Sequence, residues 1–145
     1  MTTVAAILKH KGFQVTTIDP MATIARVVDV LAEHRIGAVL VVDRAEQLLG
    51  IVSERDIVRC LAANGARTLE MTAGQLMTRA LQVAHPDTTV AEAMGSMTLG
   101  RFRHMPVMEH DVLVGLISIG DVVKARIMEQ ESEVDSLKAY VAGSA

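Results

Sequence analysis

Two short phrases, Ser53-x-x-Asp56 and Ser118-x-x-Asp121, place a hydroxyl and a carboxylate where an apolar run passes into a helical pattern. This spacing is typical of a helix cap, with Ser at the N-cap and Asp three residues later, where the helix dipole favours an acid. The same arrangement can bind a nucleotide. The helix amides and the Ser hydroxyl would meet a phosphate, while the carboxylate accepts hydrogen bonds from a ribose diol. Both interpretations stay open at this point.

A second candidate is a group of potential cations, Arg101, Arg103 and His104, just before an apolar Met-Pro-Val segment. The formal net charge of the chain is -3. Such a group predicts an anionic partner, because an Arg guanidinium can bind phosphate oxygens through two parallel hydrogen bonds. A polar helix exit is the alternative interpretation.

Both candidates belong to an internal repeat. The phrase at 50–59 returns at 115–124, and the upstream pairs include Pro20 with Pro86 and Thr23 with Thr89. A duplicated segment folds as two related units, so we expect any site as a related pair. The first copy has Arg-Ile-Gly-Ala at 35–38 where the second carries its cations. The two sites should therefore differ in affinity or in ligand charge.

Each repeat is predicted to fold as strand, helix, strand, strand, helix. In the first repeat the pattern predicts an extended segment at 14–18, a helix over 23–35, a hairpin of 38–42 with 48–52, and a helix over 53–63. The second has an extended segment at 81–84, a helix over 89–100, strands at 105–108 and 112–117, and a helix from 118. Thr23 should cap the first long helix and Gly37 terminate it, while Thr89 with Glu92 forms a capping box.

At 145 residues the chain suits one compact core shared by both repeats. We divide it into a lead-in helix (1–14), repeat one (15–63), a connector (64–80), repeat two (81–128) and a C-terminal helix extension (129–145). Apolar residues at 123, 127, 134, 137 and 141 continue the last helix beyond what so small a core can cover. They predict a self-association surface, and a mobile, partly solvated tail is the alternative.

Composition argues against several classes of protein. No apolar run is long enough to span a bilayer, and the N-terminus lacks the basic and apolar regions of a secretory signal, so we expect no membrane partner. The single cysteine, Cys60, fits a reducing, cytoplasmic location. The negative charge and the few aromatic residues argue against nucleic acid as a partner. No metal spacing and no nucleophile, base and oxyanion set is present, so we expect no metal, no catalytic cofactor and no enzyme activity.

The sequence resembles tandem CBS domains, the paired repeats called a Bateman module. The resemblance rests on the Gly-apolar-apolar-Ser-x-x-Asp phrase in both repeats, on Met105-Pro106-Val107, and on the Pro-x-x-Thr helix starts at Pro20 and Pro86. It implies an α/β (α+β) fold in which two βαββα repeats pack as one pseudo-symmetric module. It also implies a regulatory module that binds AMP, ATP, NAD(H) or S-adenosylmethionine between its repeats and senses energy or redox state. A homodimer and an unknown effector protein are the implied partners.

The resemblance also implies a nucleotide-binding set. Asp56 and Asp121 would bind ribose, and Ser53 and Ser118 would be the hydroxyls on the phosphate side. The remaining implied residues lie against the adenine, at the strand starts or beside the acid: Thr16, Thr17, Ile18, Gly37, Ala38, Arg55, Val83, Ala84, Met105 and Pro106.

Arg103 and His104 would reach the phosphate of the ligand held by Asp56. Many repeats carry a His or Arg and a Pro where this chain has Gly37-Ala38, which weakens the expectation of a charged phosphate in the Asp121 cleft. A dimeric scaffold or interaction protein without a ligand is the rival hypothesis, and an enzyme with weak nucleotide-hydrolysing or redox activity is a remoter one.

Overall fold

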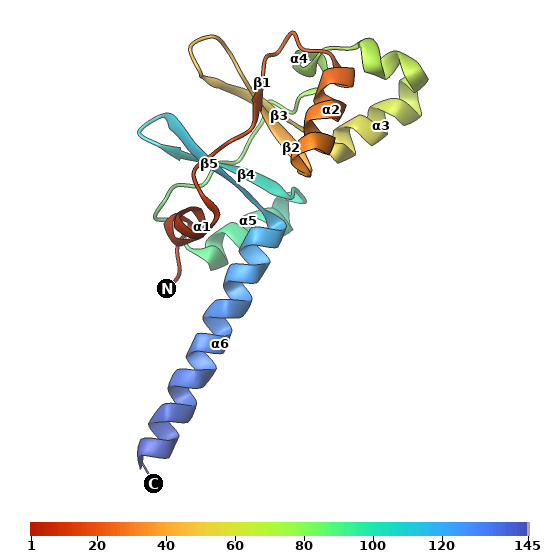
Figure 1. The fold of residues 1–145 in the computed structure, drawn as a ribbon. Coiled ribbons are helices and arrows are strands. Elements are labelled where there is room, and N and C mark those ends of the chain that lie inside the picture. The colour runs from red at the N-terminus through yellow and green to blue at the C-terminus, as the bar shows by residue number, and fades with distance from the viewer. Residues whose placement is uncertain (145) are drawn as a thin grey trace. The chain divides into compact units, whose positions relative to one another are not determined.

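A computed structural model describes residues 1–144 and shows a mixed helix and strand protein, which confirms the predicted α+β class (Figure 1). The helices are α1 (Val4–Lys11), α2 (Ile24–His34), α3 (Glu54–Asn64), the 3-10 helix η1 (Gly65–Glu70), α4 (Ala73–Leu76), α5 (Val90–Gly100) and α6 (Ile119–Ser144). The strands are β1 (Thr17–Ile18), β2 (Ala38–Val42), β3 (Leu48–Ser53), β4 (His104–Glu109) and β5 (Val112–Ser118). No helix within 1–144 is long and apolar enough to cross a membrane.

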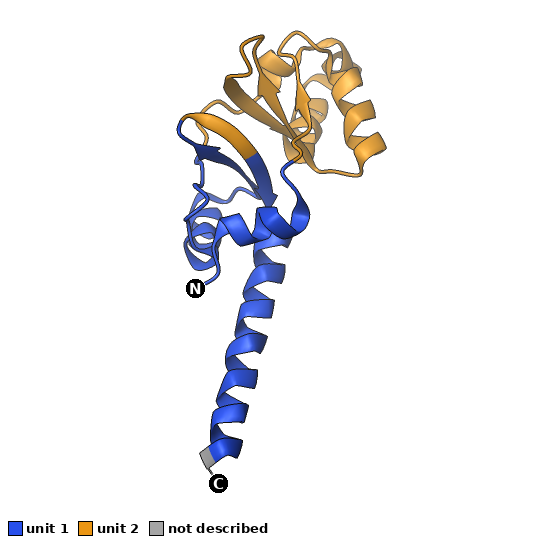
Figure 2. Ribbon diagram, turned by 60° about the vertical axis from the view of Figure 1, so that its left-hand side comes forward, with its two compact units in different colours: residues 1–13, 82–110, 115–145 blue, residues 14–81, 111–114 orange. Residues whose placement is uncertain are grey.

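The chain forms two compact units (Figure 2). Unit 2 contains residues 14–81 and 111–114, and unit 1 contains 1–13, 82–110 and the chain from 115 onward. The first repeat therefore lies in unit 2. Most of the second repeat lies in unit 1, together with the N-terminal helix α1.

Unit 2 is built on a three-stranded sheet in the order β1-β2-β3. β1 runs parallel to β2, with Thr17 opposite Leu40, and β2 runs antiparallel to β3, with Ala38 opposite Ser53. The strands are rich in β-branched residues, which favour the pleated conformation. The buried residues of the sheet and of helices α2 and α3 form one apolar cluster: Ile24, Val27, Val30, Leu31, Val39, Val41, Val52 and Ile57. This cluster fixes the end of β3, where the first Ser-x-x-Asp phrase begins.

Helix α2 starts where the sequence predicts and ends differently. The Thr23 hydroxyl accepts a hydrogen bond from the Arg26 amide at 3.2 Å, which confirms the N-cap. The expectation that Gly37 terminates the helix is wrong. The last turn closes at Arg35, which adopts the left-handed conformation with φ +53°. Helix α5 ends in the same way at Arg101, with φ +54°. A non-glycine residue can hold this conformation where the surrounding fold imposes it, so local sequence preference did not reveal it.

β4 and β5 form a two-stranded sheet, and β4 and the part of β5 from Gly115 onward belong to unit 1. The expected extended segment at 81–84 contributes one parallel bridge, between Ala84 and Val107, rather than a full strand. Two hydrogen bonds hold it: Ala84 N donates to Pro106 O at 2.8 Å, and Met108 N donates to Ala84 O at 2.9 Å.

Each of the two short helices that precede the repeats packs against the other repeat, and we call this arrangement an exchange. α1 precedes repeat one, yet it packs in unit 1, where Thr3 bridges Thr89 at the start of α5. In the same way α4 precedes repeat two but packs in unit 2, where Thr72 bridges Thr23 at the start of α2. Equivalent backbone hydrogen bonds support the two junctions: Val4 N to Thr88 O, Val90 N to Thr2 O, Ala73 N to Ala22 O and Ile24 N to Met71 O, all at 2.8–2.9 Å.

This exchange explains the glycine that opens each repeated phrase. A Cβ on Gly115 would lie 2.6 Å from Leu8 Cδ2 of α1, and a Cβ on Gly50 would lie 2.8 Å from Met77 Sδ and from the Thr78 carbonyl oxygen. Real Cβ atoms do not approach so closely. Glycine is therefore required where the exchanged segment packs on the strand.

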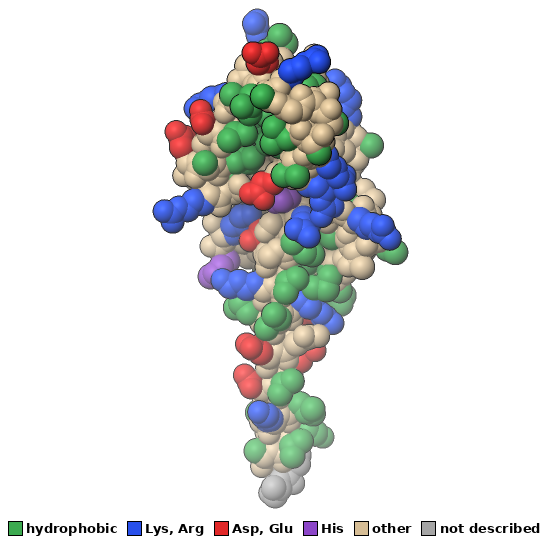
Figure 3. All heavy atoms as spheres, turned by 90° about the vertical axis from the view of Figure 1, so that its right-hand side faces the viewer, with side chains coloured by type: hydrophobic (Ala, Val, Ile, Leu, Met, Phe, Trp, Pro, Cys, Tyr) green, Lys and Arg blue, Asp and Glu red, His purple; other side chains and the backbone are tan. Residues whose placement is uncertain are grey.

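The C-terminal part of α6 is the least covered element. Its first turns pack beside α5 and α1, and Val122 is fully buried. From residue 130 to residue 143 every side chain is exposed. Apolar side chains are visible at the surface along this helix, next to charged ones (Figure 3).

Candidate functional site

The first Ser-x-x-Asp phrase forms a complete helix cap at the junction of β3 and α3. The Ser53 hydroxyl accepts a hydrogen bond from the Asp56 amide at 3.3 Å, while Asp56 Oδ2 accepts one from the Ser53 amide at 2.8 Å and one from the Ser53 hydroxyl at 2.9 Å. The structural interpretation of the phrase is therefore confirmed. It does not compete with ligand binding, because a cap also fixes the carboxylate and the helix amides in place.

Residues 37–38 meet residues 53–56 at this cap, and residues 16–18 pair with β2 next to residues 37–38. We call these three segments of unit 2 together the Asp56 cluster. The amide of Glu54 donates to the Gly37 carbonyl oxygen at 2.9 Å, and Ala38 lies opposite Ser53 in the sheet. The extended segment joins through Leu40, whose amide donates to Thr16 O at 3.3 Å. Unit 2 thus brings together all the site residues that the sequence predicted in the first repeat.

Unit 1 repeats the arrangement in the Asp121 cluster, made of residues 83–84, 103–106 and 118–121. Asp121 Oδ2 accepts a hydrogen bond from the Ser118 amide at 2.8 Å, and the Ser118 hydroxyl accepts one from the Asp121 amide at 3.2 Å. The amide of Ile119 donates to the Arg103 carbonyl oxygen at 2.7 Å. This contact is the counterpart of the bond from Glu54 to Gly37. The second-repeat residues of the predicted site therefore also come together within one unit.

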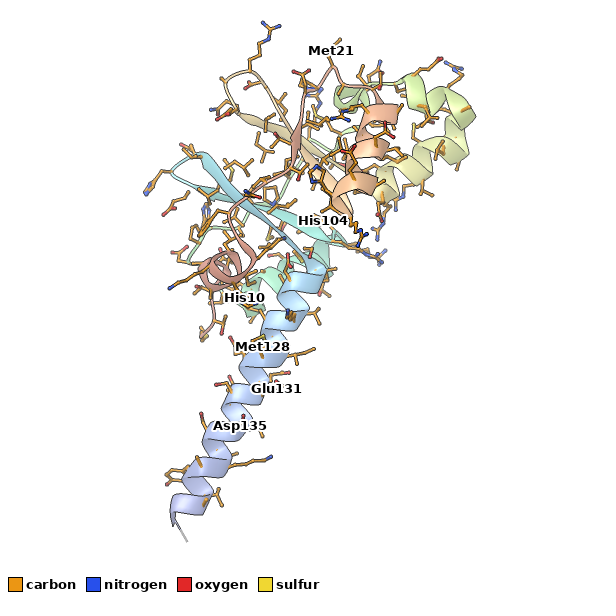
Figure 4. The ribbon with its side chains drawn as sticks, in the orientation of Figure 1. His10, Met21, His104, Met128, Glu131 and Asp135 are labelled. Atoms are coloured by element: carbon orange, nitrogen blue, oxygen red, sulfur yellow. The ribbon has the colours of Figure 1, made fainter. Side chains whose placement is uncertain are left out.

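Burial divides the residues of the Asp121 cluster. Met105 and Pro106 are buried, so they can take part only through the shape and backbone of β4. Arg103 is exposed and His104, labelled in Figure 4, is half-buried at the start of β4. Side chains able to contact a phosphate are thus present on the surface of unit 1.

One residue that sequence reasoning missed distinguishes the two clusters. Lys11, in the last turn of α1, places its Nζ 2.6 Å from Asp121 Oδ2 and 2.9 Å from the Leu116 carbonyl oxygen. Burial raises the pKa of the Asp121 carboxyl, but Lys11 and the Ser118 amide more than offset this effect, so the pKa lies below its ordinary value.

The corresponding position near α4 has no cation. Leu8 and Met77 contact equivalent glycines, and counting three residues onward from each gives Lys11 in one case and Ala80 in the other. No local pattern marks Lys11, since it lies 110 positions from Asp121 in the sequence. The one feature of the sequence that could have pointed to Lys11 is the difference between Lys11 and Ala80 at equivalent positions of the segments that precede the two repeats.

A groove of about 570 Å³ adjoins this ion pair, between α1 and the first turns of α6. His10 and Met128, labelled in Figure 4, lie on its two sides, and Lys11, Asp121 and Lys124 line it as well. Asp121 is therefore shared between the helix cap and the wall of a groove.

Comparison with known proteins identifies the fold. The family model described as "CBS domain" matches residues 4–63 and 73–127. Over 153 aligned residues the chain is 36% identical to the mitochondrial CBS domain-containing protein CBSX3 of Arabidopsis thaliana, covering 98% of this chain and 73% of that protein.

Two solved structures extend the comparison. The CBS-domain containing protein ATU1752 from Agrobacterium tumefaciens is 43% identical with a TM-score of 0.84, over 86% of this chain and 93% of that one. The CBS domain pair of protein MJ0100, solved with 5'-methylthioadenosine and S-adenosyl-L-methionine, is 26% identical with a TM-score of 0.77, over 90% of this chain and 98% of that one.

Proposed function

Because the chain belongs to the CBS-domain family, as the match to both repeats shows, we propose that it is a regulatory module that binds an adenosine compound and is not an enzyme. The observation that carries the proposal is the pair of equivalent clusters. In each, a Ser and an Asp cap a helix beside the start of a hairpin strand. The adenosine ligands of the related MJ0100 domain pair support the same chemistry.

We assign the ribose to the carboxylate and the phosphate to the helix start. A carboxylate fixed by its own cap can accept the two ribose hydroxyls without further loss of side-chain freedom. The Ser hydroxyls and the cationic side chains of Arg103 and His104 contact the phosphate, helped by the helix amides. The segments at 16–18 and 83–84 offer backbone and apolar contacts to the adenine.

The Asp56 cluster is the stronger ribose site in this proposal. At the Asp121 cluster Lys11 already neutralises the carboxylate and donates to one of its oxygens. A ribose would have to compete with that ion pair. We therefore propose AMP, ATP, NAD(H) or S-adenosylmethionine as ligands held first through Asp56, with sensing of energy or redox state as the consequence.

A thermal unfolding screen tests the proposal. The purified protein is heated with AMP, ADP, ATP, NAD, NADH, S-adenosylmethionine or 5'-methylthioadenosine. A ligand present at a hundred times its dissociation constant adds about 2.7 kcal/mol to the stability of the folded state, which raises the unfolding midpoint by several degrees. We expect the shift to be lost in Asp56→Asn, which keeps the size of the side chain and an oxygen for the cap.

Asp29→Asn is the matched control, since Asp29 is exposed on α2, in the same unit, and the charge change is identical. It should keep the full ligand shift. If none of the seven compounds moves the midpoint of the wild-type protein, the nucleotide proposal is wrong and the scaffold alternative replaces it.

We further propose a homodimer that passes the ligand state to an effector protein. The exposed apolar residues of α6 support self-association. A cytoplasmic location stays a prediction that rests on the single cysteine, while the name of the Arabidopsis relative places that protein in mitochondria.

A further inference from the structure

The C-terminal half of α6 buries no side chain among the residues that the structure describes up to 143. Residues 130–143 are exposed on every side of the helix. An isolated helix of roughly 12–15 residues is only marginally stable in water, because the free energy lost in forming the first turn is barely recovered by the hydrogen bonds of a few further turns. A helix of this kind is normally stabilised by packing an apolar face against a partner.

The apolar face is present, and its spacing is that of a coiled coil. Val123, Ile127, Val134, Leu137 and Val141 are 40–63% exposed. Their separations of four, seven, three and four residues match alternating d and a positions of a heptad, with Gln130 at the d position between Ile127 and Val134. Hydrophobic residues that repeat every 3.5 positions form a seam that two helices can share.

The charges beside the seam select one orientation. With Ile127 and Val134 at a, Glu133 occupies a g position and Lys138 the following e position. In a parallel pair, a g residue faces the next e residue of the partner helix, so Glu133 of each copy faces Lys138 of the other. Arg126 and Glu131 have the same relation, although Arg126 also pairs with Glu129 within its own helix.

An antiparallel pair that buried the same seam would be repulsive. It would set Val123 against Val141 and Ile127 against Leu137. This register brings Glu131 opposite Glu131, Glu133 opposite Glu133 and Lys124 opposite Lys138. Like charges at these flanking positions disfavour the arrangement.

We propose that α6 pairs with α6 of a second copy as a parallel, in-register, two-stranded coiled coil over residues 123–141. The proposal rests on the homodimer of the proposed function and adds its interface and orientation. Gln130 then lies against Gln130 in the seam, where a polar side chain costs stability but fixes the register.

Disulfide trapping in the full chain tests the orientation. Cys60 is first replaced by Ala, and Leu137→Cys is introduced as a seam residue. Mild oxidation should give a covalent dimer, because the two residues at 137 face each other in a parallel pair. Ser132→Cys, at an f position on the outer face of the helix, is the control and should stay monomeric on a non-reducing gel.

Each alternative has its own result. The Ile127→Cys and Leu137→Cys chains are also mixed and oxidised. A disulfide that joins residue 127 of one chain to residue 137 of the other, with no 137 to 137 disulfide, would show an antiparallel pair and overturn the proposed orientation. Equal crosslinking of Ser132→Cys would overturn the seam. A wild-type chain that sediments as a monomer would contradict the homodimer itself. None of these three results bears on the nucleotide shift measured by unfolding.

Charge reversal supplies a second test that needs no cysteine. Glu133→Lys alone and Lys138→Glu alone each set like charges against each other, so the dimer dissociation constant should rise severalfold in both. An equimolar mixture of the two variants restores opposite charges at both flanks, and we expect heterodimers to dominate. Homodimers of unchanged affinity would contradict the pairing of Glu133 with Lys138.

Discussion

Lys11 Nζ lies 2.6 Å from Asp121 Oδ2 and so ties the last turn of α1 to the first turn of α6, across 110 positions of the sequence. The two side chains are 38% and 25% exposed, so the pair contributes on the order of 1 kcal/mol or less to stability. Under the proposed function, its larger effect is on ligand binding. It neutralises one of the two carboxylates that would otherwise be equivalent.

The Asp56 and Asp121 carboxylates should differ in ribose binding because only Asp121 pairs with Lys11. Replacing Lys11 by Met keeps an apolar stem on α1 but frees the Asp121 carboxylate to accept ribose hydroxyls. We expect isothermal titration with the ligand found by the unfolding screen to show tighter binding at the Asp121 cluster, seen as a higher stoichiometry. Lys9→Met, on the same helix, should leave the titration unchanged. Weaker binding in Lys11→Met would show instead that Lys11 contacts the ligand.

The second prediction follows from the pKa of Asp121. Lys11 and Ser118 lower this pKa in the folded state, despite the opposing effect of burial. A lowered folded pKa means that the stabilisation is fully present above the unfolded pKa of about 3.9 and is lost as the pH falls through the folded pKa. Asp121→Asn should therefore lower the unfolding midpoint at pH 7. The difference in midpoint between this variant and the wild type should become smaller below about pH 4, because the wild-type carboxylate then becomes protonated as well.

The control for this titration is Asp135→Asn, an exposed acid farther along α6. Its effect on the midpoint should be small at both pH values. A difference between wild type and Asp121→Asn that stayed constant down to pH 2 would show that the side chain acts through packing and not through its charge.

The third prediction tests why each repeated phrase opens with glycine. Gly115→Ala would force a Cβ against Leu8, and Gly50→Ala would force one against Met77 and the Thr78 backbone. Overpacking of this kind costs about 1–3 kcal/mol. Urea unfolding should show Gly50→Ala as the more severe variant, because a backbone carbonyl cannot move aside as a side chain can.

Gly95→Ala is the matched control, since Gly95 lies inside α5 and a Cβ there meets nothing within 4 Å. It should stabilise the protein by roughly 0.5–1 kcal/mol, the usual gain in a helix. Leu8 is itself buried, so the clash is tested by a double-mutant cycle: if the clash is the cause, Leu8→Ala and Gly115→Ala together should cost less stability than the sum of their separate costs. Equal stability of all three glycine variants would refute the packing explanation.

Local order was readable from the sequence because its causes are local. The capping pair of Ser53 with Asp56, the box of Thr89 with Glu92, and the β-branched hairpin strands depend on residues a few positions apart. Even so, the end of α2 at Arg35 escaped this reasoning. A left-handed residue without glycine is imposed by packing and leaves no mark in local preference.

The sequence by itself determined that the protein is a doubled unit, which residues cap the starts of its main helices, and which side chains of each repeat form a candidate site. It did so because periodicity, caps and internal identity are properties of neighbouring residues. Only the tertiary structure shows that α1 and α4 each pack against the other repeat, and that Gly50 and Gly115 leave room for these segments. It alone also shows that Lys11 pairs with Asp121. Those contacts join residues distant in the chain. They depend on the path that the folded backbone takes, which no pattern of adjacent residues specifies.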